Sequence, residues 1–385
     1  MMKIPLAFIL ILCFFGCCSP SEHSYQNLLN TIKSQTEVVE LISNNGKARL
    51  MVSPFHQGKI LASTYDGLDG DYNGWINTIA LADTISKNKN IGGEERLWLG
   101  PLGSQFSFYY QQIKPISDAN WKVPETIDAE PYQLVAIEKD VVSLTKNMRL
   151  TNFVGTIFNL KIDRTITLFN SEAIKQNLNI DFDSSMNFVA FETKNTLTNT
   201  DSIPWTKNTG LIGLWSAGMY KGTDDSVVII PLQHQGNLDN IYTYFGTLDE
   251  TRLLLKENTL LFKGDGKYKT KIGIPPQFAP NMYGCYTKSK NRLTIVEYKK
   301  ENDSLYSNSF ISIQDEPYKG EAIPIYNNNK DFFELESNAA LKEMQPNETD
   351  THWHRVYHFS GSETELSEIA NALLGIDLED CEFKE

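Results

Sequence analysis

Strand-like runs of β-branched and aromatic residues follow one another from Val38 almost to the end of the chain. Residues of these types fit the pleated, half-buried surface of a sheet. Loops rich in Asn, Asp, Gly and Lys separate the runs, and no sustained helical periodicity lies between them, which argues against alternating βαβ units. Clear runs are residues 141–144, 156–168, 227–230 and 293–298. The predicted fold class is therefore all-β, a large antiparallel β-sandwich.

A hairpin is predicted near the start of the sandwich. Asn45 and Gly46 lie between the strand-like runs 38–43 and 48–52. Asn-Gly is the strongest short signal for a two-residue hairpin turn, because both positions tolerate a positive φ.

Short helices are predicted at both ends of the sandwich. Apolar residues recur at helical spacing from Tyr25 to Ile32, and residues 362–365 form a capping box that opens an amphipathic stretch ending at Gly375. The predicted division is a signal peptide over residues 1–16, a lipidated tether with a short helix over 17–36, the sandwich over 37–361, and a helix with a tail over 362–385.

The N-terminus resembles a lipoprotein signal peptide. Lys3 precedes the apolar run 4–15, and Gly16 is followed by Cys17. The run is shorter than the roughly 20 residues that a spanning helix needs. Cleavage before Cys17 would make it the acylated first residue and anchor the protein to a membrane surface. The alternative is an ordinary secretory signal with accidental cysteines.

Charge and cysteine content exclude several classes. The formal net charge is -13, and an acidic body repels nucleic acid and anionic lipid, so no nucleic-acid partner is expected. Beyond the signal peptide and Cys17, only Cys18, Cys285 and Cys381 remain, without a regular spacing. No disulfide framework or cysteine metal knuckle is predicted.

Several segments together resemble a family of uncharacterised exported bacterial lipoproteins, a domain of unknown function that has a galactose-mutarotase-like (aldose epimerase-like) fold. These segments are residues 57–64, 74–77, 92–101, 150–156, 191–199, 244–246, 262–268, 333–337 and 352–359. The sequence departs from the family pattern at Leu102 and Ser104, where an acidic residue and a glycine are expected, and at Lys59, where arginine is usual. The resemblance also implies placement in the outer membrane of a Gram-negative bacterium.

The resemblance implies a candidate base. Mutarotases open a sugar ring with a base and an acid, and their base is a glutamate in a Glu-x-Gln pattern, which residues 336–338 resemble with Asn338 in the glutamine place. Glu336 is the candidate base, and Glu334 lies two residues earlier on the same strand face. The alternative is that both carboxylates lie on a solvated face.

The acid is less clear, because the histidine segments of mutarotases are missing. His234 and His354 are the candidate acids, and the spacing of His352, His354 and His358 places all three on one strand face. A divalent metal at His352 and His354 is a further possibility, but no cofactor is expected.

Carbohydrate binding needs flat aromatic surfaces and planar polar groups. Arg96 and Trp98 form the leading binding pair, because they lie two residues apart on one strand face, and Trp75, Glu334 and His352 are further candidates. Trp215 is interpreted as a core residue.

Three functions follow from these residues. The first is a cell-envelope lipoprotein that binds a carbohydrate without established catalysis. The second is an aldose 1-epimerase-like isomerase that uses Glu336, and the third is a scaffold that contacts another envelope protein. Fold alone does not separate them.

Overall fold

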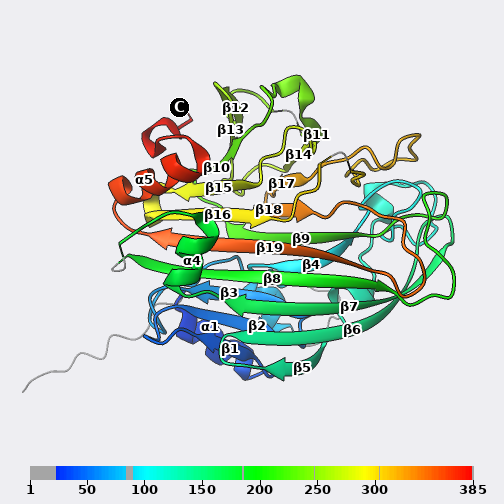
Figure 1. The fold of residues 1–385 in the computed structure, drawn as a ribbon, viewed down its shortest axis with the longest axis horizontal. Helices are drawn as coiled ribbons and strands as arrows, with labels where there is room; N and C mark the ends of the chain where they lie inside the picture. Colours follow the sequence, from blue (N-terminus) through cyan, green and yellow to red (C-terminus); the bar gives the residue numbers. More distant parts are fainter. Residues whose placement is uncertain (1–22, 84–89, 184–185, 247, 303, 384–385) are drawn as a thin grey trace, which may run out of the picture.

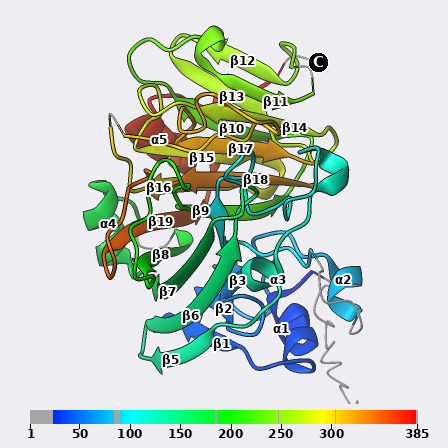
Figure 2. The same cartoon turned by 90° about the vertical axis from the view of Figure 1, so that its right-hand side faces the viewer.

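The computed structural model describes residues 23–83, 90–183, 186–246, 248–302 and 304–383. Two large antiparallel sheets form the body, and a small sheet lies beside them (Figures 1 and 2). The predicted all-β antiparallel sandwich is confirmed. The proposed signal peptide, Cys17 and most of the tether lie outside the described residues.

The larger sheet has ten strands. Their order is β12 (Leu253–Lys256), β13 (Thr259–Lys263), β10 (Ser226–Pro231), β15 (Met282–Thr287), β16 (Arg292–Tyr298), β19 (Thr349–Ser360), β8 (Asn187–Asn199), β7 (Ile157–Leu168), β6 (Val141–Thr151) and β5 (Gln133–Ile137).

The second sheet has six strands and carries the site described below. Their order is β11 (Tyr242–Phe245), β14 (Thr270–Ile274), β17 (Ile323–Asn327), β18 (Phe332–Asn338), β9 (Gly213–Lys221) and β4 (Arg96–Gly100).

The third sheet contains β1 (Val39–Ile42), β2 (Arg49–Ser53) and β3 (Lys59–Thr64). β1 and β2 pair antiparallel around Asn45 and Gly46, which confirms the predicted hairpin.

Alternating side chains build the core between the two large sheets. In β6 and β7 every second residue is buried, as expected for strands that turn one face to a core. Two apolar clusters fill the interior. Polar residues also lie inside, where Arg164 forms a buried ion pair with Glu95.

Helices cover the outside of the sheets. α1 (Tyr25–Lys33) buries Tyr25, Leu28, Leu29 and Ile32, and α5 (Glu363–Leu374) begins at the capping box of Ser362 and ends at Gly375, so both predicted terminal helices are confirmed. α4 (Ser171–Leu178) and α5 cover the outer face of the ten-stranded sheet (Figure 2). The remaining short helices are α2 (Thr78–Ala82), α3 (Glu125–Asp128), η1 (Asp118–Asn120), η2 (Leu238–Asn240), η3 (Lys288–Lys290) and η4 (Leu378–Asp380).

The helix α4 was not expected. It is two turns long and buries only Ile174 and Leu178, so its periodicity is too short to stand out from the flanking strands. Asn170 caps its first turn. Within the described residues, no helix is both long and apolar enough to cross a bilayer.

Candidate functional site

The candidate site lies on the face of the six-stranded sheet that points away from the ten-stranded sheet. Phe245 opposes Lys271, Lys271 opposes Tyr326, and Tyr326 opposes Glu334. Directly opposed residues share a sheet face, so these four side chains from β11, β14, β17 and β18 form one row.

A second row runs beside the first and brings the N-terminal strand β4 to the late strand β18. Arg96 opposes Ala217 on β9, and Ala217 opposes Glu336 on β18. The small alanine side chain leaves space above it for the two longer side chains on either side. Arg96 and Glu336, which are far apart in the sequence, therefore lie on the same face of the sheet. The two rows on this face form the floor of the site.

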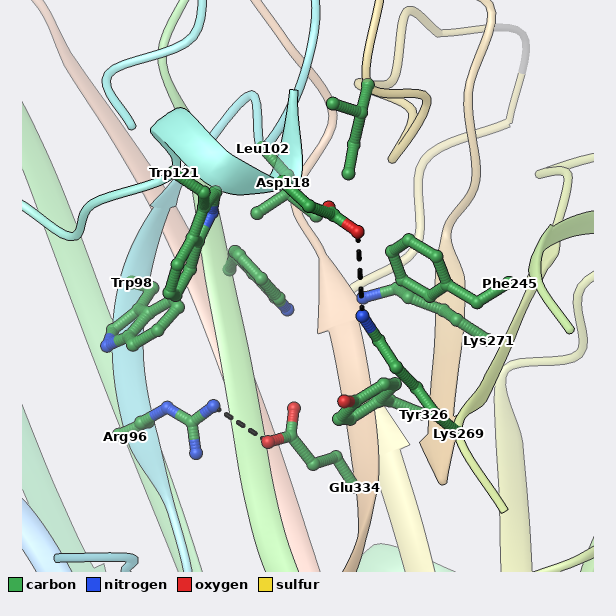
Figure 3. A pocket seen from close by; sticks show the side chains of 12 residues that line it. Arg96, Trp98, Leu102, Asp118, Trp121, Phe245, Lys269, Lys271, Tyr326 and Glu334 are labelled. Carbon is green, nitrogen blue, oxygen red and sulfur yellow. Dashed lines mark hydrogen bonds and ion pairs between the residues drawn. The ribbon is translucent and has the colours of Figure 1, made fainter. Parts of the chain in front are cut away.

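A cavity of about 260 Å³ opens above this floor, with loops around its mouth (Figure 3). Trp98 and Trp121 stand on one side, and Phe245 and Tyr326 stand opposite. Its lining residues are Arg96, Trp98, Leu102, Asp118, Trp121, Trp215, Phe245, Lys269, Lys271, Ile311, Tyr326 and Glu334. The predicted pair Arg96 and Trp98 and the carboxylate of Glu334 thus lie together.

Arg96 is held in the cavity wall by one ion pair. Its Nη2 donates to Glu334 Oε1 at 3.0 Å, and its guanidinium lies 4.6 Å from the centre of the Trp98 ring. Arg96 is only 4% exposed and Glu334 only 5%. Within the part of the chain that the structure describes, Arg96 Nε and Nη1 are buried without a hydrogen-bond partner. Two donors next to the cavity are therefore unused.

The orientation of the Trp98 indole is fixed by Asp128 and Lys59. Its Nε1 donates to Asp128 Oδ1 at 3.1 Å, and Lys59 Nζ lies 3.0 Å from the same oxygen. Lys59, at a position where arginine was expected, therefore holds the carboxylate that orients the indole ring.

Glu336 lies beneath the cavity and is fully buried. Its Oε2 accepts a hydrogen bond from Trp215 Nε1 at 2.7 Å and from Lys271 Nζ at 3.0 Å, while its Oε1 lies 3.2 Å from the same Lys271 nitrogen. Burial raises the pKa of Glu336, and the nearby Glu334 adds to this, while the Lys271 ammonium opposes it. The prediction that these carboxylates share a face holds, but neither lies on a solvated face.

A second buried carboxyl lies behind Lys271 and was not singled out from the sequence. Glu321 Oε2 accepts a hydrogen bond from Tyr244 Oη, and its Oε1 accepts one from Ser309 Oγ at 2.8 Å. Burial raises the pKa of Glu321 to about 7, against the opposing effects of Tyr244 and Lys271. Because its partners lie on other strands and loops, no local motif marks it.

His352 and His354 lie on the opposite side of β18 from the cavity. Ser337 Oγ lies 2.9 Å from His352 Nε2 and 2.9 Å from His354 Nδ1, between the two large sheets. Burial lowers the pKa of His352 to about 3 and that of His354 to about 4, so both rings are neutral at pH 7. As predicted, they share a face with His358, but that face points inward. They are therefore not brought to the cavity.

Two further predicted residues also lie elsewhere. His234 is exposed in a turn after β10 with a φ of 54°, and it does not line the cavity. Trp75 packs against Phe332, with ring centroids 4.5 Å apart, and does not line the cavity either. A loop histidine or a tryptophan gives no sign in the sequence of which surface it will join.

Two other expectations about single residues are refined. Trp215 belongs to the core, as interpreted, but it also lines the cavity and binds Glu336. Ser104, at a position where glycine was expected, has a φ of 72°, a left-handed conformation that favours glycine. Leu102 lines the cavity where an acidic residue was expected.

The described residues contain no group of three or more His, Cys, Asp or Glu side chains that could hold a metal ion. Of the described residues that line the cavity, none is a histidine. The titratable groups that line the cavity are therefore carboxyl, ammonium, guanidinium and phenol groups.

Comparison with known sequences assigns the chain to a family. The sequence model of a family of unknown function, DUF6786, matches residues 23–384. The chain belongs to this family. No curated protein matches its sequence.

Solved structures show the same fold as this DUF6786 member. A candidate aldose 1-epimerase from Escherichia coli K12 has a TM-score of 0.50 at 12% identity, over 84% of this chain and 98% of that one. The Slr1438 protein from Synechocystis sp. PCC 6803 has a TM-score of 0.52 at 10% identity, over 85% of this chain and 97% of that one. A galactose mutarotase-like protein from Lactobacillus casei ATCC 334 is similar at 11% identity, with a TM-score of 0.46 over 84% of this chain and 100% of that one. The first two of these structures confirm the mutarotase-like fold that the resemblance implied.

Proposed function

We propose that this DUF6786 protein is a cell-envelope lipoprotein that binds a carbohydrate in the cavity above Arg96, Trp98 and Glu334. The observation that carries the proposal is that two buried nitrogens of Arg96, Nε and Nη1, have no hydrogen-bond partner among the described residues and lie beside an aromatic ring. A buried polar atom without a partner is costly, at about 1–3 kcal/mol, and in native structures it calls for an explanation such as a bound group.

The other side chains around the cavity suit the same ligand. Trp98, Trp215 and Tyr326 provide flat apolar faces, and Lys271 and Glu334 provide charged donors and acceptors. Sugars present C–H faces and hydroxyl groups together, so they need this mixture of flat and polar surfaces. A purely apolar ligand would leave Arg96 Nε and Nη1, which have no partner among the described residues, still without one.

The geometry supports binding over catalysis. Glu336 is fully buried, and both of its oxygens are engaged by Lys271, with Trp215 as a further donor. A base must reach the sugar proton at hydrogen-bond distance, which Glu336 does only if this arrangement opens. The histidines that could act as acids lie elsewhere, as described above.

An aldose 1-epimerase-like isomerase is the second candidate. The raised pKa of Glu336 and the Lys271 ammonium beside it place a proton acceptor and a proton donor next to the cavity. A conformational change that exposes Glu336 would be required.

The lipid anchor is part of the proposal and depends on Cys17. An acylated Cys17 would lie only a few residues before the first described residue, His23, and would hold the sandwich close to the membrane.

A glycan array combined with polarimetric measurement of mutarotation tests the proposal. We expect binding to at least one glycan and no acceleration of mutarotation for the sugars that bind. Binding with clear acceleration would favour the isomerase, and the absence of any glycan ligand would contradict the proposal.

A further inference from the structure

The mouth of the cavity carries apolar side chains that the sandwich does not bury. Trp121 is 40% exposed although it lines the cavity, and Phe310 is 40% exposed next to the lining residue Ile311. Ile313 follows at 62% exposure on the same loop. These residues stand on loops around the mouth and not on the floor.

Neighbouring aromatic rings hold Trp121 and Phe310 in place at the mouth of the cavity. Trp121 is stacked on the fully buried Tyr109, with ring centroids 6.0 Å apart and an angle of 5° between the rings. Phe310 packs edge-on against Tyr244 at 4.6 Å. One face of the Trp121 indole is thus backed by the core, and the ring is held in place at the mouth.

Hydrogen bonds join the loop that carries Gly103 and Gln105 to the loop that carries Phe310 and Gln314. Gln105 Nε2 donates to the backbone carbonyl of Gln314 at 2.8 Å, and the backbone amide of Gln314 donates to Gln105 Oε1 at 3.0 Å. Gly103 lies so close to the Phe310 carbonyl that a Cβ there would come within 1.9 Å of its oxygen. These contacts fix the two loops of the rim relative to each other.

Polar groups lie on the rim as well. Lys269 Nζ is 3.8 Å from Asp118 Oδ2, and both side chains are partly exposed (Figure 3). Lys269 Nζ also lies 4.7 Å from the centre of the Phe245 ring. The mouth therefore combines charged side chains with an indole ring, as the floor does, but at the mouth these groups are exposed.

We infer that the ligand is an oligosaccharide, with one sugar unit in the cavity and the following unit stacked on Trp121 at the rim. This inference rests on the proposed carbohydrate-binding function. The cavity of about 260 Å³ is smaller than the roughly 300–1,000 Å³ of pockets that enclose drug-sized ligands, so it has room for a single ring. A longer chain must leave through the mouth, where Trp121 presents the next aromatic surface.

The test is isothermal titration with monosaccharides and their matched di-, tri- and tetrasaccharides. The probes are glucose, galactose, mannose, xylose and N-acetylglucosamine, each as the free sugar and as its oligosaccharides. The trisaccharide of the preferred sugar should bind at least tenfold more tightly than the monosaccharide. In Trp121→Ala this ratio should fall by about five- to tenfold, as expected from the loss of one aromatic stacking contact.

Controls separate the rim from the fold and from the cavity. Trp121→Phe should keep most of the ratio, because it keeps an aromatic face, and Phe310→Ala provides a second variant of the rim. Phe55→Ala removes an aromatic side chain that is 55% exposed away from the cavity and should change neither affinity.

Equal affinity for monosaccharide and trisaccharide in the wild type would overturn the oligosaccharide inference and leave the proposed function intact. A ratio that neither Trp121→Ala nor Phe310→Ala lowers would overturn it as well. If no sugar of any length binds, both proposals are wrong.

Discussion

Replacing the buried ion pair of Arg96 and Glu334 as a unit should separate folding from ligand binding. In Arg96→Met alone, the Glu334 carboxylate stays buried without its cation, and such a loss costs about 3–5 kcal/mol of the free energy of unfolding. In the double variant Arg96→Met with Glu334→Leu, both charges are removed and the volume is nearly kept. Replacing a buried pair in this way is neutral or stabilising by about 1–4 kcal/mol.

The surroundings of Arg96 indicate whether the double variant is destabilised, neutral or stabilised. The double variant also removes Arg96 Nε and Nη1, which are buried without partners in the described part of the chain and are therefore already unfavourable in the free protein. Each such group costs about 1–3 kcal/mol. We therefore expect the double variant to be at least as stable as the wild type.

Urea unfolding and calorimetric titration with a sugar from the glycan array measure the two effects separately. The double variant should unfold at an equal or higher urea concentration but lose at least about 100-fold in sugar affinity, because two donor nitrogens of the Arg96 guanidinium and the acceptor oxygens of Glu334 are gone. A double variant that is more than about 3 kcal/mol less stable than the wild type, or that keeps wild-type affinity, would refute the reasoning.

Three further predictions follow from single residues. Glu336→Gln keeps the shape and an acceptor oxygen but cannot take a proton, so a binding protein should lose only a few-fold in affinity by titration, whereas a loss of mutarotation activity by orders of magnitude would reveal an isomerase. Because the pKa of Glu321 is raised to about 7 in the folded protein, the contribution of Glu321 to the free energy of unfolding should fall as the pH rises from about 4.5 to about 7, while the lowered pKa values of His352 and His354 contribute with the opposite sign. Glu321→Gln should remove about 3 kcal/mol of this dependence in urea unfolding, and identical slopes for variant and wild type would be inconsistent with the buried carboxyl. Finally, Cys17→Ala should release the protein from the membrane fraction while Cys18→Ala should not, and a Cys17→Ala protein that still sediments with membranes would disprove the lipid anchor.

Much of the fold could be predicted because it depends on local patterns. Runs of β-branched and aromatic residues identified the strands, Asn45 and Gly46 identified the hairpin, and the capping box at Ser362 identified the last helix. Each of these signals lies within a few residues of the element that it specifies.

The site could be predicted only in part, because strand periodicity gives the face of a side chain but not what that face meets. Arg96 and Trp98 were correctly placed together, and so were His352 and His354. The first pair points to the cavity and the second to the interior, a difference set by the packing of the two sheets.

Partners from distant strands were beyond local reasoning for the same reason. Lys271 meets Glu336 only because β14, β17 and β18 pair in a specific register. Glu321 reaches Tyr244 only because β14 lies between β11 and β17 and carries Gly273, which has no side chain, at the point where the two residues meet. The spacing of Lys269 and Lys271 places both on one strand face, and this local signal could have suggested that lysines join Arg96 at the site.

A crystal structure of the protein with a sugar from the glycan array tests the central claim most directly. We predict one sugar ring against the face of Trp98, with hydroxyl groups within hydrogen-bond distance of Arg96 Nε or Nη1, the two donors that lack a partner among the described residues. A sugar bound tightly in solution but located outside this cavity, with both Arg96 donors still unpartnered, would contradict the account.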